Sequence, residues 1–84
     1  MMTTLEKSTK RHEYFCRKNK QIAETHGSDF EIKYHTALYN YHKMVVDIQK
    51  KSNKLLTKEQ KNFLYGLALV PFLHDQSNNQ TIKE

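Results

Sequence analysis

The chain has 84 residues, a formal net charge of +5, and 37% hydrophobic residues. This length provides one small domain with one modest core, and such domains often need a second copy or a partner to bury more apolar surface. Two glycines and one proline exclude a fold of many short strands joined by tight turns, so we expect an all-α protein. The basic surplus suits polyanions and acidic protein surfaces, and it also keeps a small protein in solution.

The cysteine content and the apolar runs predict the cell compartment. Cys16 is the only cysteine, which excludes an internal disulfide and the stapled scaffold of small secreted proteins. The N-terminal stretch has no apolar core ahead of its charges and does not resemble a signal peptide. The longest apolar run, residues 63–73, is about half the ~20 residues that cross a bilayer. We therefore expect a cytoplasmic protein without a membrane partner.

The first predicted helix covers residues 3–26. Thr3 and Glu6 have the spacing of a capping box, and Gly27 is placed to end the helix in a left-handed conformation. The inward face of this helix is half polar, so we expect weak packing and fraying of its first two turns. That face comprises Leu5, Ser8, His12, Phe15, Asn19, Ile22 and His26.

The second predicted helix covers residues 28–53. Ser28 and Glu31 form a second capping box, and Asn53 is suited to a left-handed cap at the other end. Because so few residues separate the first two helices, they must fold back on each other as an antiparallel hairpin. Apolar and aromatic residues cover roughly 220° of the second helix, against ~100° for an ordinary surface helix. This helix therefore needs several neighbours.

The third predicted helix covers residues 57–70, after a capping box formed by Thr57 and Gln60. Pro71 lacks an amide hydrogen and crowds the carbonyl of residue 67, so we expect the helix to stop or kink there. The polar segment 77–84 is expected to be a disordered tail, which leaves residues 1–76 as the domain. The predicted fold is a three-helix bundle built on a long hairpin and a shorter, broken third helix.

A stripe on the second helix is the predicted partner-binding surface. It comprises His35, Tyr39, His42 and Val46. Tyrosine and histidine tolerate both water and burial, as residues at protein interfaces do. The short third helix must also cover the neighbouring apolar face, so part of the stripe should remain for a second copy or another protein. The alternative is that the third helix and the turn at Pro71 cover it completely.

The outward face of the first helix is a candidate nucleic-acid surface. Basic, aromatic and amide side chains gather there within roughly 80° of arc. They are Lys7, Lys10, Tyr14, Arg17, Lys18 and Gln21. A basic stripe with an aromatic residue can follow a phosphate backbone and stack a base. The other interpretation is a solvated lysine-rich face with acidic residues at its edge.

Metal binding and catalysis have weaker support. His12 and Cys16 stand four residues apart, as two zinc ligands on one helix can, but paired cysteines and a His-x₃-His motif are absent. The hairpin register places His12 near His42 and Met44, away from His35. We therefore expect no metal and no cofactor, with hydrogen-bonded histidines and a cysteine that fills space. Catalysis is not expected either, because a helical hairpin offers no oxyanion pocket to a Cys/His pair.

These patterns predict a small non-enzymatic interaction protein, either an adaptor, an inhibitor or a regulatory subunit. It would dock on a larger protein partner, with a homodimer as one form. The alternative is a basic nucleic-acid-binding accessory protein that contacts the phosphate backbone through its first helix, with little sequence preference because lysine lacks the planar fork of arginine.

Overall fold

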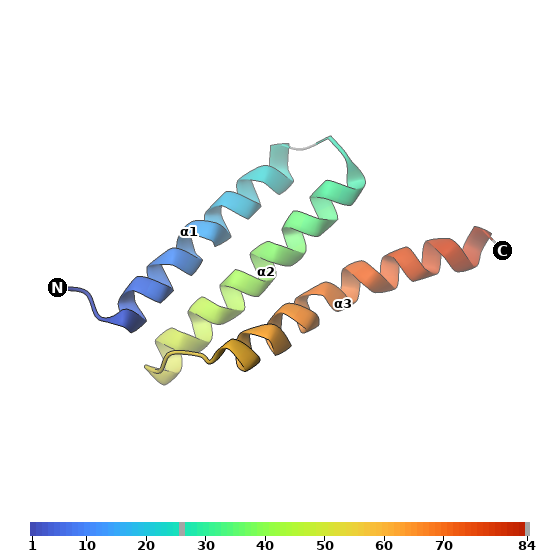
Figure 1. The fold of residues 1–84 in the computed structure, drawn as a ribbon. Helices are drawn as coiled ribbons and strands as arrows, with labels where there is room; N and C mark the ends of the chain where they lie inside the picture. The colour runs from blue at the N-terminus through green and yellow to red at the C-terminus, as the bar shows by residue number, and fades with distance from the viewer. Residues whose placement is uncertain (26, 84) are drawn as a thin grey trace.

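The computed structural model describes residues 1–25 and 27–83, with side chains described for residues 1–25 and 27–73. It contains three helices, α1 (Thr4–Thr25), α2 (Asp29–Ser52) and α3 (Lys58–Lys83) (Figure 1). The described residues include no strand. The predicted all-α fold of three helices is therefore confirmed.

The central helix is α2, with α1 and α3 on different sides of it (Figure 1). α1 and α2 form the predicted antiparallel hairpin, and α3 returns along α2. In the described part of the chain, α1 and α3 each pack on α2 and not on each other. The molecule measures 55 × 27 × 16 Å, and its smallest extent is close to the ~10–12 Å diameter of one helix with its side chains. The three-helix bundle is thus flat and open.

Two of the three predicted capping boxes are confirmed. The Glu6 amide donates to Thr3 Oγ1 (3.1 Å), and the Thr3 amide donates to the Glu6 carboxylate (3.3 Å). Before α3, the Gln60 amide donates to Thr57 Oγ1 (3.1 Å), and the Thr57 amide donates to Gln60 Oε1 (2.9 Å). Asn53 takes the predicted left-handed cap after α2, with φ 55° and ψ 34°. These local signals place both ends of α1 and α2 and the start of α3 within about two residues of the predicted bounds.

The connection between α1 and α2 differs from the prediction in two details. Ser28 takes the N-cap position but makes no side-chain cap bond, and the Glu31 carboxylate lies 3.3 Å from His35 Nε2 one turn along α2. Gly27 does not adopt the expected left-handed conformation. The end of α1 is satisfied instead by the Thr25 hydroxyl, which donates to the carbonyl four residues earlier (2.9 Å).

α3 passes through Pro71, so its predicted end near residue 70 is wrong. A proline inside a helix removes one backbone hydrogen bond and costs about 3 kcal/mol. The next residue opposes this cost, because the Phe72 ring lies edge-on to Phe30 (5.3 Å) and Tyr34 (6.3 Å) near the start of α2. Aromatic contacts therefore hold the chain against α2 just beyond the proline. The predicted tail, residues 77–84, lies outside the residues whose side chains are described.

The core is small and has two chemically different halves. Its buried apolar residues are Ala37, Val45, Val46, Leu64 and Ala68. α1 contributes only polar residues to the buried set: Thr9, His12 and Asn19. Hydrogen bonds therefore dominate the packing of α1 on α2, whereas apolar contacts dominate the packing of α3. No helix in the described part of the chain is both long and apolar enough to cross a membrane.

Candidate functional site

The stripe His35, Tyr39, His42 and Val46 lies against α1 inside the chain. Val46 is buried, and the three aromatic members are partly buried. α1 covers part of this stripe, and its three aromatic members keep part of their surface exposed, so partner binding through the stripe stays a prediction. A helix with a half-polar inward face packs closely here because the stripe itself is half polar.

Matched polar side chains join α1 to this stripe. His12 and His42 share a hydrogen bond between their Nδ1 atoms (2.8 Å), which confirms the predicted proximity of these two histidines. Two turns nearer the α1–α2 connection, His35 Nδ1 donates a second hydrogen bond to Asn19 Oδ1 (2.8 Å). Among the described residues, no buried side-chain nitrogen or oxygen lacks a partner. A satisfied polar contact of this kind fixes the register of two helices.

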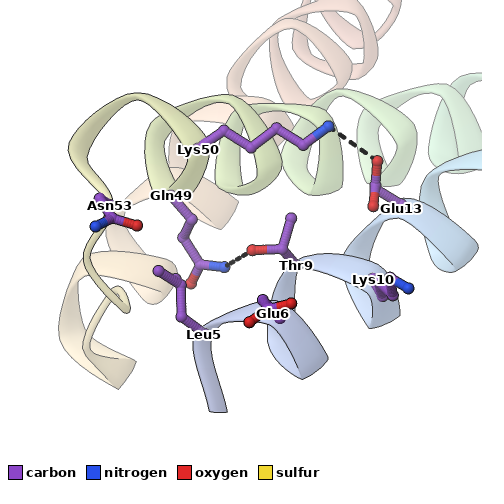
Figure 2. Close-up of a pocket in the computed structure, with 8 residues that line it drawn as sticks. All are labelled: Leu5, Glu6, Thr9, Lys10, Glu13, Gln49, Lys50 and Asn53. Carbon is purple, nitrogen blue, oxygen red and sulfur yellow. Dashed lines mark hydrogen bonds and ion pairs between the residues drawn. The ribbon is translucent and has the colours of Figure 1, made fainter. Parts of the chain in front are cut away.

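Gln49 closes the same row of polar contacts at the open end of the hairpin. It is fully buried, and its Nε2 donates to Thr9 Oγ1 (3.0 Å), as Figure 2 shows. Its Oε1 accepts the backbone amide of Leu56 (3.1 Å) in the segment that precedes α3. The sequence interpretation missed this residue. The signal was present, because Gln49, His42 and His35 recur every seven residues and therefore share one side of α2.

The depression beside Gln49 has a volume of about 330 Å³ and is drawn in Figure 2. Lys50 Nζ spans it to reach the Glu13 carboxylate (3.1 Å). Lys50 and Glu13, which face each other across the depression, thus neutralise each other. The polar groups that line the depression do not point toward a common position for a ligand (Figure 2). It offers no chemical site.

Cys16 and His12 form hydrogen bonds with different residues. The Cys16 thiol donates to the Tyr39 carbonyl (3.6 Å), while His12 pairs with His42. In the described part of the chain, no three His, Cys, Asp or Glu side chains come together as metal ligands. Burial raises the pKa of the Cys16 thiol, which disfavours the reactive thiolate. The thiol therefore acts as a packed hydrogen-bond donor in this geometry.

The histidine pair lies in a cationic environment. Burial lowers the pKa of His12 to about 4, and the charges of Lys61 and Arg11 act in the same direction. Burial and Lys61 also lower the pKa of His42. Both imidazoles are therefore neutral at pH 7, and the surrounding positive charge opposes a bound metal cation.

The predicted basic face of α1 is open to solvent. All six of its residues, Lys7, Lys10, Tyr14, Arg17, Lys18 and Gln21, are exposed. None of the four cations forms an ion pair among the described residues, and Glu13 at the edge is engaged by Lys50. The face thus keeps its full positive charge.

The side of α3 that faces away from α2 is the largest apolar surface that the sequence interpretation missed. Four residues, which we call the outer stripe, lie there with large exposed fractions: Phe63 (67%), Leu67 (47%), Val70 (55%) and Leu73 (57%). The opposite side of α3 already buries Leu64 and Ala68. A helix that is apolar all round belongs in an interior. The sequence signal was the charge-free run of residues 62–73.

The outer stripe continues onto α2. A depression of about 400 Å³ beside Phe63 is lined by Ile48, Leu56 and Leu64, with two polar residues at its rim. Ile48 is itself exposed, so the apolar surface spans two helices.

No protein-family model, curated protein or solved structure matches this chain. The surfaces themselves therefore carry the functional argument. Two of them are unpartnered within the described residues, namely the outer stripe of α3 and the basic face of α1.

Proposed function

We propose that this chain is a small, non-enzymatic, cytoplasmic interaction protein that docks through the outer stripe of α3, and that a second copy of the chain is the partner. One observation carries the proposal. Phe63, Leu67, Val70 and Leu73 form a charge-free apolar row on a helix whose other side already packs on α2.

The exposed area of the chain supports a partner of standard size. The molecule exposes 6379 Å², whereas a compact monomer of 10.0 kDa exposes about 5200 Å². The excess of roughly 1100 Å² is comparable with the ~800 Å² that each partner buries in a standard protein interface. Covering one helical face would therefore bring each chain close to the exposure of a compact protein.

Charge favours a second copy over an unrelated surface. A two-fold interface uses the same surface on both partners, so a charge near the two-fold axis lies close to its own copy. The chain carries +5 overall, but residues 62–73 carry no charge. Two copies therefore meet along this segment without like-charge repulsion, and Phe, Leu and Val side chains interdigitate as ridges and grooves of paired helices.

Light scattering of the purified chain over a range of concentrations tests this proposal. We expect a dimer that dissociates on dilution. Leu67→Glu places a charge in the stripe and should give a monomer with unchanged helical content by circular dichroism. Asn40→Glu adds the same charge at an exposed position of α2 and should leave the dimer intact. A wild-type chain that stays monomeric at about 200 µM, or a Leu67→Glu variant that still dimerises, contradicts self-pairing.

The second candidate function is nucleic-acid binding through α1. The observation that favours it is the exposure of all six residues of the basic face, whose charges have no acidic partner among the described residues. Affinity for a generic duplex should then fall by orders of magnitude between about 50 and 200 mM salt. Charge reversal at Lys10 and Arg17 should abolish it. Absence of binding at low salt rules this function out.

A further inference from the structure

A groove of about 550 Å³ opens between α1 and α3, with α2 as its floor. Three cations line it: Lys7 and Arg11 from α1, and Lys61 from α3. The aromatic residues Phe15, Tyr41 and His42 also line it, and the His12–His42 pair described above lies within it. The volume falls within the ~300–1,000 Å³ typical of small-ligand sites.

The positive charge of the groove is not neutralised within the chain. No acidic residue lines it, and Lys7, Arg11 and Lys61 form no ion pair among the described residues. Lys61 comes from a different helix than the other two, so the fold itself brings these cations to one depression. The positive charge is also felt inside the groove, because Lys61 and Arg11 both lower the pKa of His12. A concave, uncompensated cationic site of this kind concentrates anions.

The floor of the groove presents a flat aromatic surface. The Phe15 ring stacks on the His42 ring at a centroid distance of 5.4 Å and an interplanar angle of 26°. Phe15 nevertheless remains 43% exposed, which is unusual for a phenylalanine that lines a groove. An exposed ring beside cations is the arrangement that proteins use to stack a base next to its phosphate.

We infer that this groove binds a small phosphate-bearing ligand with a flat ring, of the nucleotide class. Its phosphate would lie between Arg11, Lys61 and Lys7, and its ring would lie on Phe15. A phosphate is favoured over a carboxylate because its greater charge matches three cations, and because the arginine fork donates two parallel hydrogen bonds to phosphate oxygens. The outer stripe of α3 plays no part in this site, so the inference is independent of self-pairing.

The test is a titration of the full chain with adenosine monophosphate, followed by amide and histidine-ring NMR shifts. We expect saturable binding with shifts centred on residues of the groove, and no binding of adenosine, which lacks the phosphate. Inorganic phosphate should bind more weakly, because it cannot stack. Lys61→Gln and Arg11→Gln should each weaken binding at least about tenfold, as expected for loss of a charged hydrogen-bond donor. Lys10→Gln removes the same charge from α1 outside the groove and should change affinity less than about twofold.

A second readout separates a bound phosphate from a general loss of charge. A dianion beside Lys61 and Arg11 offsets their effect on the imidazoles, so saturation should raise the pKa of His12. Three results overturn the inference: adenosine that binds as tightly as the monophosphate, equal losses for Lys10→Gln and Lys61→Gln, or an unchanged pKa of His12 at saturation. Preference for a long oligonucleotide, lost with Lys10→Gln, would instead assign the anion binding to the outward face of α1.

Discussion

Acidification should destabilise this fold through His12. The side chain is only 7% exposed and shares a hydrogen bond with His42. The groups that face it are Arg11 on its own helix, Tyr41 and His42 on α2, and Lys61 on α3. None of them is acidic, so a proton added to this imidazole gains no counter-charge. Burial and these neighbours lower its pKa to about 4.

The sign and size of the effect follow from linkage. An unfolded histidine titrates near pH ~6.5, so the unfolded chain takes up a proton in a range where folded His12 resists it. The stabilising contribution is fully present above pH ~6.5 and is lost as the pH falls toward about 4. At pH 4.5 the loss from this one residue is about 2.5 kcal/mol. That is a large part of the ~5–15 kcal/mol that holds a typical domain folded.

Urea unfolding followed by circular dichroism, at several pH values between about 7.5 and 4.5, measures this loss. His12→Gln cannot protonate in that range, and its free energy of unfolding should depend much less on pH. His35→Gln is the matched control, because it removes a partly buried histidine of α2 that is not part of the His12–His42 pair, and it should keep the wild-type pH dependence. Equal wild-type stability at both ends of the range would refute the reasoning, as would a full pH dependence in His12→Gln.

Two further substitutions test the packing on either side of α2. Gln49→Leu fills a similar volume but leaves the partly buried Leu56 amide without its acceptor, so it should lower the free energy of unfolding by about 1–3 kcal/mol in urea titrations. A loss below about 0.5 kcal/mol would contradict that role. Pro71→Ala restores a backbone hydrogen bond inside α3 and should raise stability by up to about 3 kcal/mol, measured as a higher thermal midpoint. A lower midpoint would mean that the proline itself positions Phe72.

The sequence predicts the helices better than it predicts their contacts. Capping at Thr3, Thr57 and Asn53 depends on residues within one turn, and these signals placed the helix ends correctly. At Ser28 the side-chain cap bond does not form, and the Glu31 carboxylate contacts His35 one turn along the same helix. Local signals are reliable where no longer-range partner competes for the same side chain.

The course of α3 through Pro71 shows that a local signal can also be overridden by contacts between distant segments. A proline signal is local, and it correctly identifies a lost hydrogen bond. The outcome depends on Phe72, which meets Phe30 and Tyr34 from a segment about forty residues earlier in the chain. Those partners cannot be identified from residues near the proline. Tertiary contacts therefore decide where this helix continues.

The sequence identified the stripe on α2 but not the exposed stripe on α3, and the reason again lies in contacts between helices. Helical periodicity correctly identifies a half-polar face on α1 and a histidine-rich stripe on α2. It does not show that these two faces pack on each other. Polar faces are costly when buried alone and favourable when matched. His12 with His42, and Asn19 with His35, form such matches. These pairs cover part of the stripe on α2, and a second apolar surface is exposed on α3.

The contacts on the two sides of α2 thus differ in how strictly they fix the position of the neighbouring helix. Hydrogen bonds on the α1 side fix a register, because a one-residue slip would leave buried groups such as Gln49 unpaired. Apolar contacts on the α3 side are strong but tolerant of shifts, since dispersion and burial are not directional. An outer contact at Phe63 and Leu67 would hold α3 against α2 without specifying its position. The groove residue Lys61 lies two positions from Phe63 and therefore on a different side of the helix, so the groove and the outer stripe use separate faces of α3.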